Sequence, residues 1–185
     1  MLWSFFPSPN TRWCTSKFKI EPIDEFLAAQ GECRLFIGFN ADEDPGSDRT
    51  GNFMKCKNVS YEYPLHEDGY TREDCENILI KYGLHPNFPP FMQRGGCKNC
   101  FFKTRGELKA KYIFDPDGFM EDELFETELQ DKRKKFYFIN MNAKGSYKQI
   151  REEVEAEIKR WGIDEVKKWY SDIKPHKPCG VFCHR

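Results

Sequence analysis

Apolar residues follow a helical period in some stretches of the chain and form short continuous runs in others. Two of the periodic stretches begin with the capping-box patterns Thr71-x-x-Asp74 and Ser146-x-x-Gln149. The short apolar runs are rich in β-branched and aromatic residues, as is typical of buried strands. We therefore expect helices at residues 20–30, 71–82, 119–131, 146–161 and 164–173, and strands at 33–39, 59–65 and 135–139.

Two long loops separate these elements. Residues 40–58 are polar and rich in Gly, Asp and Asn, and residues 84–96 contain three prolines and end in two glycines. Helix and strand signals alternate up to the second loop, and helical signals dominate after it. The pattern predicts an α/β region over residues 1–115, a helical C-terminal region over 116–173 and a cysteine-containing tail over 174–185.

The overall charge excludes a strong field around the whole molecule. The 185 residues include 29 Lys and Arg against 30 Asp and Glu, a net charge of -1, so any anion-binding site must be local. No apolar run approaches the roughly 20 residues of a membrane span. The start of the chain lacks the basic flank and long apolar stretch of a secretory signal, and we expect a cytoplasmic protein without membrane contact.

Eight cysteines in a chain without an export signal favour metal ligation or thiol chemistry over disulfides. Four of them form two close pairs, Cys97 with Cys100 and Cys179 with Cys183. Two thiolates separated by two residues suit one tetrahedral metal or one edge of a cluster, although a redox pair or plain buried thiols would show the same spacing. The tail pair could complete a four-ligand site, supply a nucleophile, or have no role.

A short basic run surrounds Cys14. Arg12, Lys17 and Lys19 provide the charges needed to hold a phosphate or sulfate against a thiol, but such a run is also typical of a solvated face. Arg49 and the acids Asp42, Glu43 and Asp44 lie in the first long loop. They could position a ligand or magnesium, or could simply be turn residues.

Several motifs occur in a fixed order over about residues 2–103, and the order carries more information than any single motif. They are Arg12-Trp-Cys-Thr15, Lys19-Ile-Glu-Pro22, Gly38-Phe-Asn-Ala-Asp-Glu43 with Arg49, Tyr63-Pro-Leu65, and Gly95-Gly-Cys-Lys-Asn-Cys100. This series resembles that of the phosphoadenylyl-sulfate (PAPS) reductase family. The tail segment Lys177-Pro-Cys-Gly180 resembles the family's C-terminal catalytic segment more loosely.

The resemblance implies a fold and a chemistry. The fold would be α/β, a partial doubly wound sheet of the adenine-nucleotide alpha-hydrolase type followed by the helical region. The activity would be sulfur or phosphosulfate chemistry on a nucleotide-linked substrate. Arg12, Lys17, Lys19 and Arg49 would bind the anion, and Cys14, Cys97 and Cys100 would hold a 4Fe-4S cluster or zinc. Cys183 is a candidate further metal ligand, and Cys179 would be the nucleophile or the fourth ligand.

The chain departs from the family pattern in two places. The nucleotide-binding PP-loop, Ser-Gly-Gly-x-Asp-Ser, should precede Arg12 and is not in the sequence. We therefore expect only the C-terminal half of the domain, completed by a separately encoded PP-loop-bearing half or another subunit. Iron-sulfur members carry a Cys-Cys pair where this chain has Cys14-Thr15, so the fourth ligand could be Cys33, Cys179, Cys183, a non-cysteine group, or absent.

Two other classes of function share these features. A component that thiolates or modifies nucleic acid would use the basic stretch from Arg94 to Lys111, beside the cysteine pair, to contact phosphates. A non-catalytic interaction subunit would bind zinc through Cys97, Cys100, Cys179 and Cys183.

Overall fold

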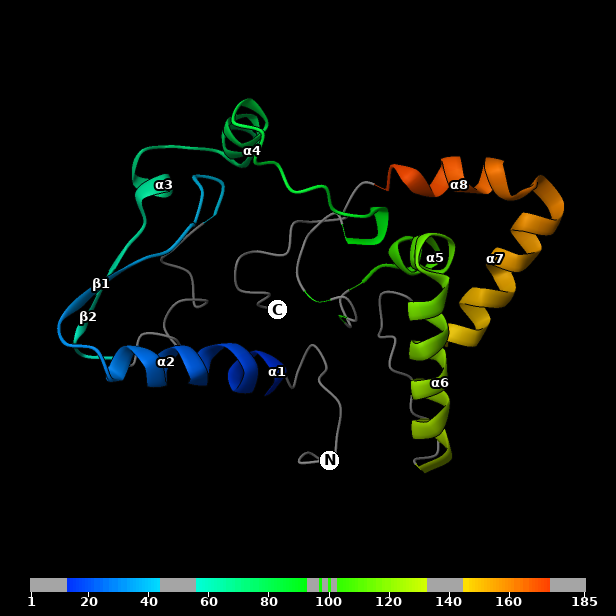
Figure 1. Ribbon diagram of the computed structural model, residues 1–185, viewed down its shortest axis with the longest axis horizontal. Helices are drawn as coiled ribbons and strands as arrows, with labels where there is room; N and C mark the ends of the chain where they lie inside the picture. Colours follow the sequence, from blue (N-terminus) through cyan, green and yellow to red (C-terminus); the bar gives the residue numbers. More distant parts are fainter. Residues whose placement is uncertain are drawn as a thin grey trace. The chain divides into compact units, whose positions relative to one another are not determined.

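The computed structural model describes residues 13–43, 56–92, 97, 100, 103–132 and 145–173 of the chain (Figure 1). The chain divides into two compact units, and each is considered by itself. The N-terminal unit comprises the described part of Asn10–Asn87 and the helical unit that of Phe88–Pro178. Helices dominate both units, and the described strands form one two-stranded parallel sheet.

The N-terminal unit begins with a helical run that is longer than the sequence suggested. It consists of α1 (Trp13–Thr15), a π-helical segment η1 (Ser16–Ile20) and α2 (Glu21–Ala28). Pro22 lies in the first turn of α2, but the helical run is continuous before it, so the proline has no N–H to donate there and its ring crowds the carbonyl four residues back. The widened π-turn, in which the Glu21 N–H donates to the Ser16 carbonyl, accommodates this proline.

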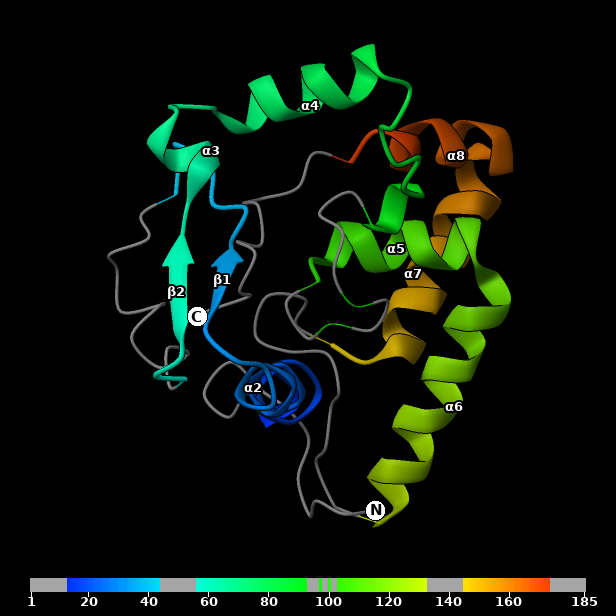
Figure 2. The same cartoon turned by 60° about the vertical axis from the view of Figure 1, so that its left-hand side comes forward.

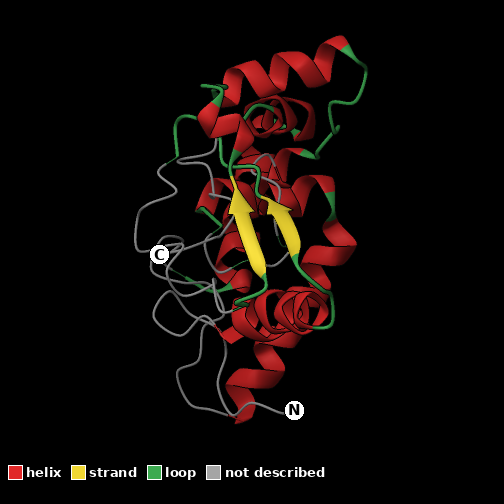
Figure 3. Ribbon diagram, turned by 90° about the vertical axis from the view of Figure 1, so that its left-hand side faces the viewer, coloured by secondary structure: helices red, strands yellow, loops and turns green. Residues whose placement is uncertain are grey.

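The two predicted strands of this unit are present and pair in parallel. They are β1 (Cys33–Phe36) and β2 (Val59–Glu62), with Cys33 opposite Val59 and Phe36 opposite Glu62. Both are shorter than expected. At the end of β2, Pro64 starts a short helix, α3 (Pro64–Glu67), because its fixed backbone angle suits the first helical position. Figure 3 shows the two strands side by side.

Helices occupy opposite ends of this sheet. Figure 2 shows α3 beyond the arrowheads, at the carboxyl ends of the strands, and α2 at their amino ends. The Asn58 side chain fixes the amino end by donating to the carbonyls of Leu27, Gln30 and Gly31. Helix α4 (Arg72–Lys81) has the predicted capping box at Thr71 and Asp74 and is followed by Gly83 at a positive φ of 66°.

The helical unit contains η2 (Pro90–Met92), α5 (Arg105–Phe114), α6 (Pro116–Lys132), α7 (Tyr147–Trp161) and α8 (Ile163–Ser171). Helix α5 packs against the other three α-helices and η2. The core contains Leu108, Phe119, Tyr147 and Ile150, and the Phe119 and Tyr147 rings meet edge to face with centroids 5.0 Å apart. By its contacts α5 belongs with the helical unit.

The predicted elements of this unit have mixed outcomes. Helices α6, α7 and α8 are confirmed, and α7 begins with the predicted capping box at Ser146 and Gln149. Helix α5 was not predicted. The strand expected at residues 135–139 lies outside the described residues. Among the described helices, none has both the length and the apolar character needed to cross a bilayer.

Replacing Gly162 with alanine is expected to destabilise the chain by about 1–3 kcal/mol. Gly162 joins α7 to α8 with φ 84° and ψ 152°, a backbone region that is open essentially only to glycine. Nothing lies within 4 Å of the position of an added Cβ, so the cost is conformational and not a clash. Urea unfolding followed by circular dichroism measures it.

Gly31→Ala is the matched control, because its added Cβ also meets nothing within 4 Å but its φ is not in the positive region. Equal stability of the two variants would contradict the conformational argument.

Candidate functional site

Two of the motif segments meet at the carboxyl ends of the parallel strands. Residues 37–43 leave β1 and residues 63–72 leave β2, and hydrogen bonds connect the two segments. The Ala41 N–H donates to the Tyr70 carbonyl at 2.7 Å, and the His66 Nδ1 lies 3.2 Å from the Asn40 carbonyl. We call these two segments the carboxyl edge.

Aromatic rings also pack against one another at the carboxyl edge. Phe39 is only 2% exposed, and its ring centroid lies 5.5 Å from that of Tyr63. Burial raises the pKa of Tyr61 and of Tyr63, so both phenols stay neutral at physiological pH. Their hydroxyl oxygens are buried, with no hydrogen-bond partner among the described residues.

The described acids of the first loop have structural roles. Asp42 accepts the Arg72 N–H at the start of α4 at 2.9 Å, and Glu43 accepts the Asn40 N–H at 3.3 Å. A carboxylate at a helix N-terminus is favoured by the helix dipole. The geometry of Asp42 and Glu43 therefore matches turn and capping residues, which was one of the two alternatives, and not a ligand or magnesium site. Asp44 and Arg49 lie outside the described residues.

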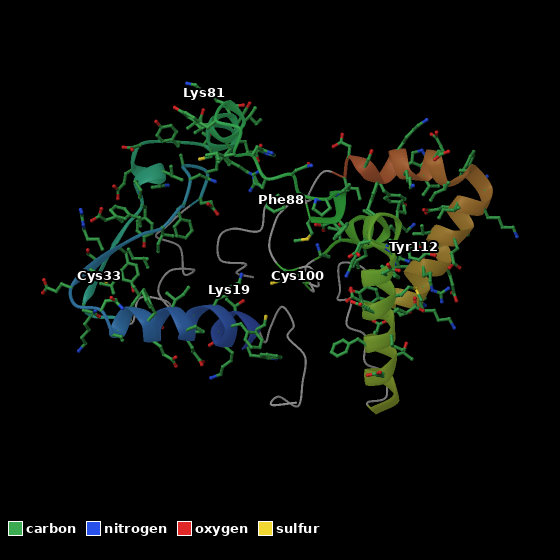
Figure 4. The ribbon with its side chains drawn as sticks, viewed as in Figure 1. Lys19, Cys33, Lys81, Phe88, Cys100 and Tyr112 are labelled. Atoms are coloured by element: carbon green, nitrogen blue, oxygen red, sulfur yellow. The ribbon has the colours of Figure 1, made fainter. Side chains whose placement is uncertain are left out.

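The basic run around Cys14 lies on the first helical run and not at the carboxyl edge. Lys17 forms an ion pair with Glu21 at 2.7 Å, Lys19 is exposed, and Cys14 is half-buried. Figure 4 shows Lys19 on this run and Cys33 on β1. Arg12 lies outside the described residues, so the predicted anion-binding set is not assembled by the part of the chain that the structure describes.

The predicted metal ligands are only partly located. Cys97 is exposed and Cys100 half-buried, and the Lys103 N–H donates to the Cys100 carbonyl at 3.0 Å. Both lie in the helical unit, whereas Cys14 belongs to the N-terminal unit. Cys179 and Cys183 are outside the described residues. Among the residues described, no three His, Cys, Asp or Glu side chains gather in a metal-binding arrangement.

Cys33, which was considered as a fourth ligand, lies on β1 in the N-terminal unit. The nearby Cys56 is held in place by a hydrogen bond from its Sγ to the Asp24 carbonyl at 3.5 Å. Burial, together with the charge of Asp24, raises the pKa of Cys56. Its thiol therefore stays protonated near neutral pH, which disfavours Cys56 as a ligand or nucleophile.

The basic stretch proposed to contact nucleic acid is largely engaged within the helical unit. Lys103 donates from its Nζ to the Phe91 carbonyl at 2.5 Å, and Lys111 pairs with Asp122. Arg105 pairs with Glu153, and Lys109 with both Glu153 and Glu157. Arg94 and Lys98 lie outside the described residues.

The pKa shifts of Lys109 and Glu153 reflect these ion pairs. Burial lowers its pKa, but hydrogen bonds to Glu157 and Glu153 outweigh this effect, so the pKa is raised. Hydrogen bonds from Arg105 lower the pKa of Glu153, against the effect of burial. The four described cations of the stretch hold the helices together, and the expectation that they contact phosphates is not supported.

Sequence reasoning overlooked the role of Asn40. Its carbonyl faces His66, its N–H donates to Glu43, and its Oδ1 accepts the Asp42 N–H at 3.0 Å. The available signal was its position, four residues beyond the end of β1, since polar residues at such strand ends often serve ligand sites.

No family model matches the chain, and the searches of curated proteins and of solved structures found no match either.

Proposed function

We propose that the chain is a PAPS-reductase-like protein or subunit that takes part in sulfur or phosphosulfate chemistry on a nucleotide-linked substrate. Its N-terminal unit would be part of a doubly wound sheet of the adenine-nucleotide alpha-hydrolase type. The sequence motifs first suggested this function, and their positions in the fold add support.

The observation that carries the proposal is the meeting of two motif segments at the carboxyl edge. Gly38–Glu43 and Tyr63–Leu65 are separate in sequence, yet each lies just beyond a strand of the parallel pair, and the Phe39 and Tyr63 rings connect them. Hydrogen bonds that involve the residues that follow, His66 and Tyr70, join the same two segments. Ligands of open parallel α/β sheets bind in the crevice outside the carboxyl ends of the strands. In a sheet of that type, the two motifs would border the substrate crevice.

The substrate anion would be bound from the loop that leaves β1. Arg49 belongs to this loop, and a guanidinium can bind phosphate or sulfate through two parallel hydrogen bonds. Arg12, Lys17 and Lys19 remain predicted anion-binding residues, but Lys17 already pairs with Glu21 and the helical run lies at the other end of the sheet. We therefore assign the principal anion contact to Arg49.

The metal centre would be held by Cys97 and Cys100. Two thiols separated by two residues fit a thiophilic metal, and Cys14 and Cys183 are the proposed further ligands, with Cys179 as nucleophile or ligand. When bound, a 4Fe-4S cluster would supply electrons, whereas zinc would stabilise the fold. A zinc-only centre would favour the non-catalytic interaction subunit.

A PP-loop-bearing partner would complete the site. The sequence contains no Ser-Gly-Gly-x-Asp-Ser segment. In the described part of the N-terminal unit the sheet has two strands, so the outer edge of each carries no further strand. Unpaired edges favour association with another strand, and sheets of two strands are rarely stable alone.

Binding of adenosine 3′,5′-bisphosphate to the full chain mixed with a PP-loop-bearing chain tests this function. We expect Arg49→Ala to weaken binding at least tenfold, because a charge-assisted hydrogen bond contributes about 1.5–3 kcal/mol. Lys57→Ala is the control, since Lys57 is an exposed cation at the amino end of β2. Calorimetry measures both, and equal affinities would contradict the proposed site.

A further inference from the structure

The corner where α7 meets α8 exposes an aromatic surface that the proposed function does not use. Trp161 and Trp169 are 52% and 43% exposed, and their rings meet edge to face with centroids 6.0 Å apart. Ile163 beside them is exposed as well. Val166 is fully buried and packs α8 into the helical unit, so the two tryptophans are not needed for this packing. Large apolar side chains grouped in solvent commonly mark an interaction site.

Cations accompany these rings. The Arg160 guanidinium lies 4.8 Å from the centroid of the Trp161 ring. Of the two acids nearby, Glu165 is already engaged, by Lys168 at 3.3 Å and by the Trp169 Nε1 at 3.2 Å. Residues 159–168 contain four cations and two acids: Lys159, Arg160, Lys167 and Lys168 against Asp164 and Glu165.

The corner is therefore positive within a chain whose net charge is -1. We call Arg160, Trp161, Ile163 and Trp169 the aromatic corner. It differs from the basic stretch of α5, whose cations are held by carboxylates of α6 and α7. Lys168 is paired with Glu165, whereas Lys159, Arg160, Lys167 and both tryptophan rings are exposed.

We propose that the aromatic corner binds single-stranded nucleic acid. Unpaired bases stack on exposed tryptophan faces, while neighbouring cations contact the phosphates. A duplex fits less well, because its bases already stack on one another and offer no free faces. A bilayer also fits less well, since the Glu165 carboxylate accepts a hydrogen bond from the Trp169 indole and Val166 is buried.

Fluorescence anisotropy with labelled dT12 and rU12 oligonucleotides and the full chain tests this inference. We expect binding that weakens with added salt, and we expect Trp161→Ala to raise the Kd about tenfold, the usual effect of removing one stacking platform. Arg160→Gln leaves the ring in place and should reduce both the affinity and the salt dependence. Comparison of dT12 with rU12 shows whether DNA or RNA is preferred.

The matched control is Tyr82→Ala. Tyr82 is also an exposed aromatic residue beside a cation, with the Lys81 Nζ 5.6 Å from its ring centroid, but it lies at the end of α4 in the N-terminal unit. Its substitution should leave the Kd unchanged. Absence of oligonucleotide binding, equal loss in the Tyr82 and Trp161 variants, or binding only to vesicles of anionic phospholipid would each overturn the inference.

Discussion

Lys111→Met is expected to lower the free energy of unfolding by about 3–5 kcal/mol, because it leaves a buried carboxylate without its cation. Lys111 is fully buried in α5, and its Nζ pairs with Asp122 of α6, whose side chain is only 11% exposed. Methionine retains most of the side-chain volume, so a cavity is not the main cause of the loss. Chemical denaturation followed by circular dichroism measures the change.

The ion pair belongs to a network that connects three helices. Burial, followed by the charge of Asp122 and a hydrogen bond to it, raises the pKa of Tyr147 in α7. The Tyr147 N–H also donates to Glu126 of α6 at 2.8 Å. Loss of Lys111 therefore affects packing among α5, α6 and α7, and the cooperativity of unfolding should decrease together with the stability.

Two further variants separate a buried charge from a general effect of removing lysine. Lys111→Met combined with Asp122→Leu removes both charges and should regain most of the lost stability. Lys148→Met removes an exposed cation that lies 3.9 Å from Glu152 and should change stability by less than about 1 kcal/mol. If Lys111→Met and Lys148→Met cost the same, the network does not have the role assigned to it.

Local signals in the sequence were sufficient for several elements. The capping boxes at Thr71 and Ser146 predicted the starts of α4 and α7, and the expected helices at 146–161 and 164–173 already separated α7 from α8. Each of these signals acts over a few residues, so its effect on the local structure does not depend on how the rest of the chain packs. The parallel pairing of β1 and β2 agrees with the predicted α/β region, although it does not specify a particular fold type.

Helix α5 shows why other features could not be predicted. It has a capping box of its own at Thr104 and Glu107, but its lysines and arginine suggested an exposed basic surface. Lys111 is buried instead, because its partner Asp122 is supplied by the following helix. Arg105 and Lys109 depend on Glu153, more than forty residues further along the chain. Such partners depend on tertiary packing, which a local pattern does not contain.

The candidate site was predictable to a similar extent. Strand signals are local, so the sequence predicted β1 and β2, but it extended them to Phe39 and Leu65. The strands end at Phe36 and Glu62, and the segments Gly38–Glu43 and Tyr63–Leu65 therefore lie beyond them. The contact between Asn40 and His66 is not local, and it was missed. The ligand set of the cysteines is also non-local, since Cys14 and the pair at 97 and 100 belong to different units.

Cys97→Ser and Cys100→Ser are each expected to abolish metal binding by the anaerobically purified chain. Serine lacks the thiolate that binds a soft metal, and the pair supplies two of the proposed ligands. Ligation energy is also folding energy, on the order of 10 kcal/mol for structural zinc sites, so the melting temperature should fall as well. Elemental analysis per chain measures the metal, and iron with sulfide would favour the reductase-like function over the zinc-binding subunit.

Cys75→Ser provides the control for this prediction. Cys75 is also a half-buried free thiol, but it lies in α4. No other cysteine is found in the sequence of this helix. This variant should retain the metal and nearly all of the stability, because it loses one weakly polar sulfur atom and no ligand. A full complement of metal in both Cys97→Ser and Cys100→Ser would rule out the pair as ligands, and the metal centre would then have to be sought among the other cysteines.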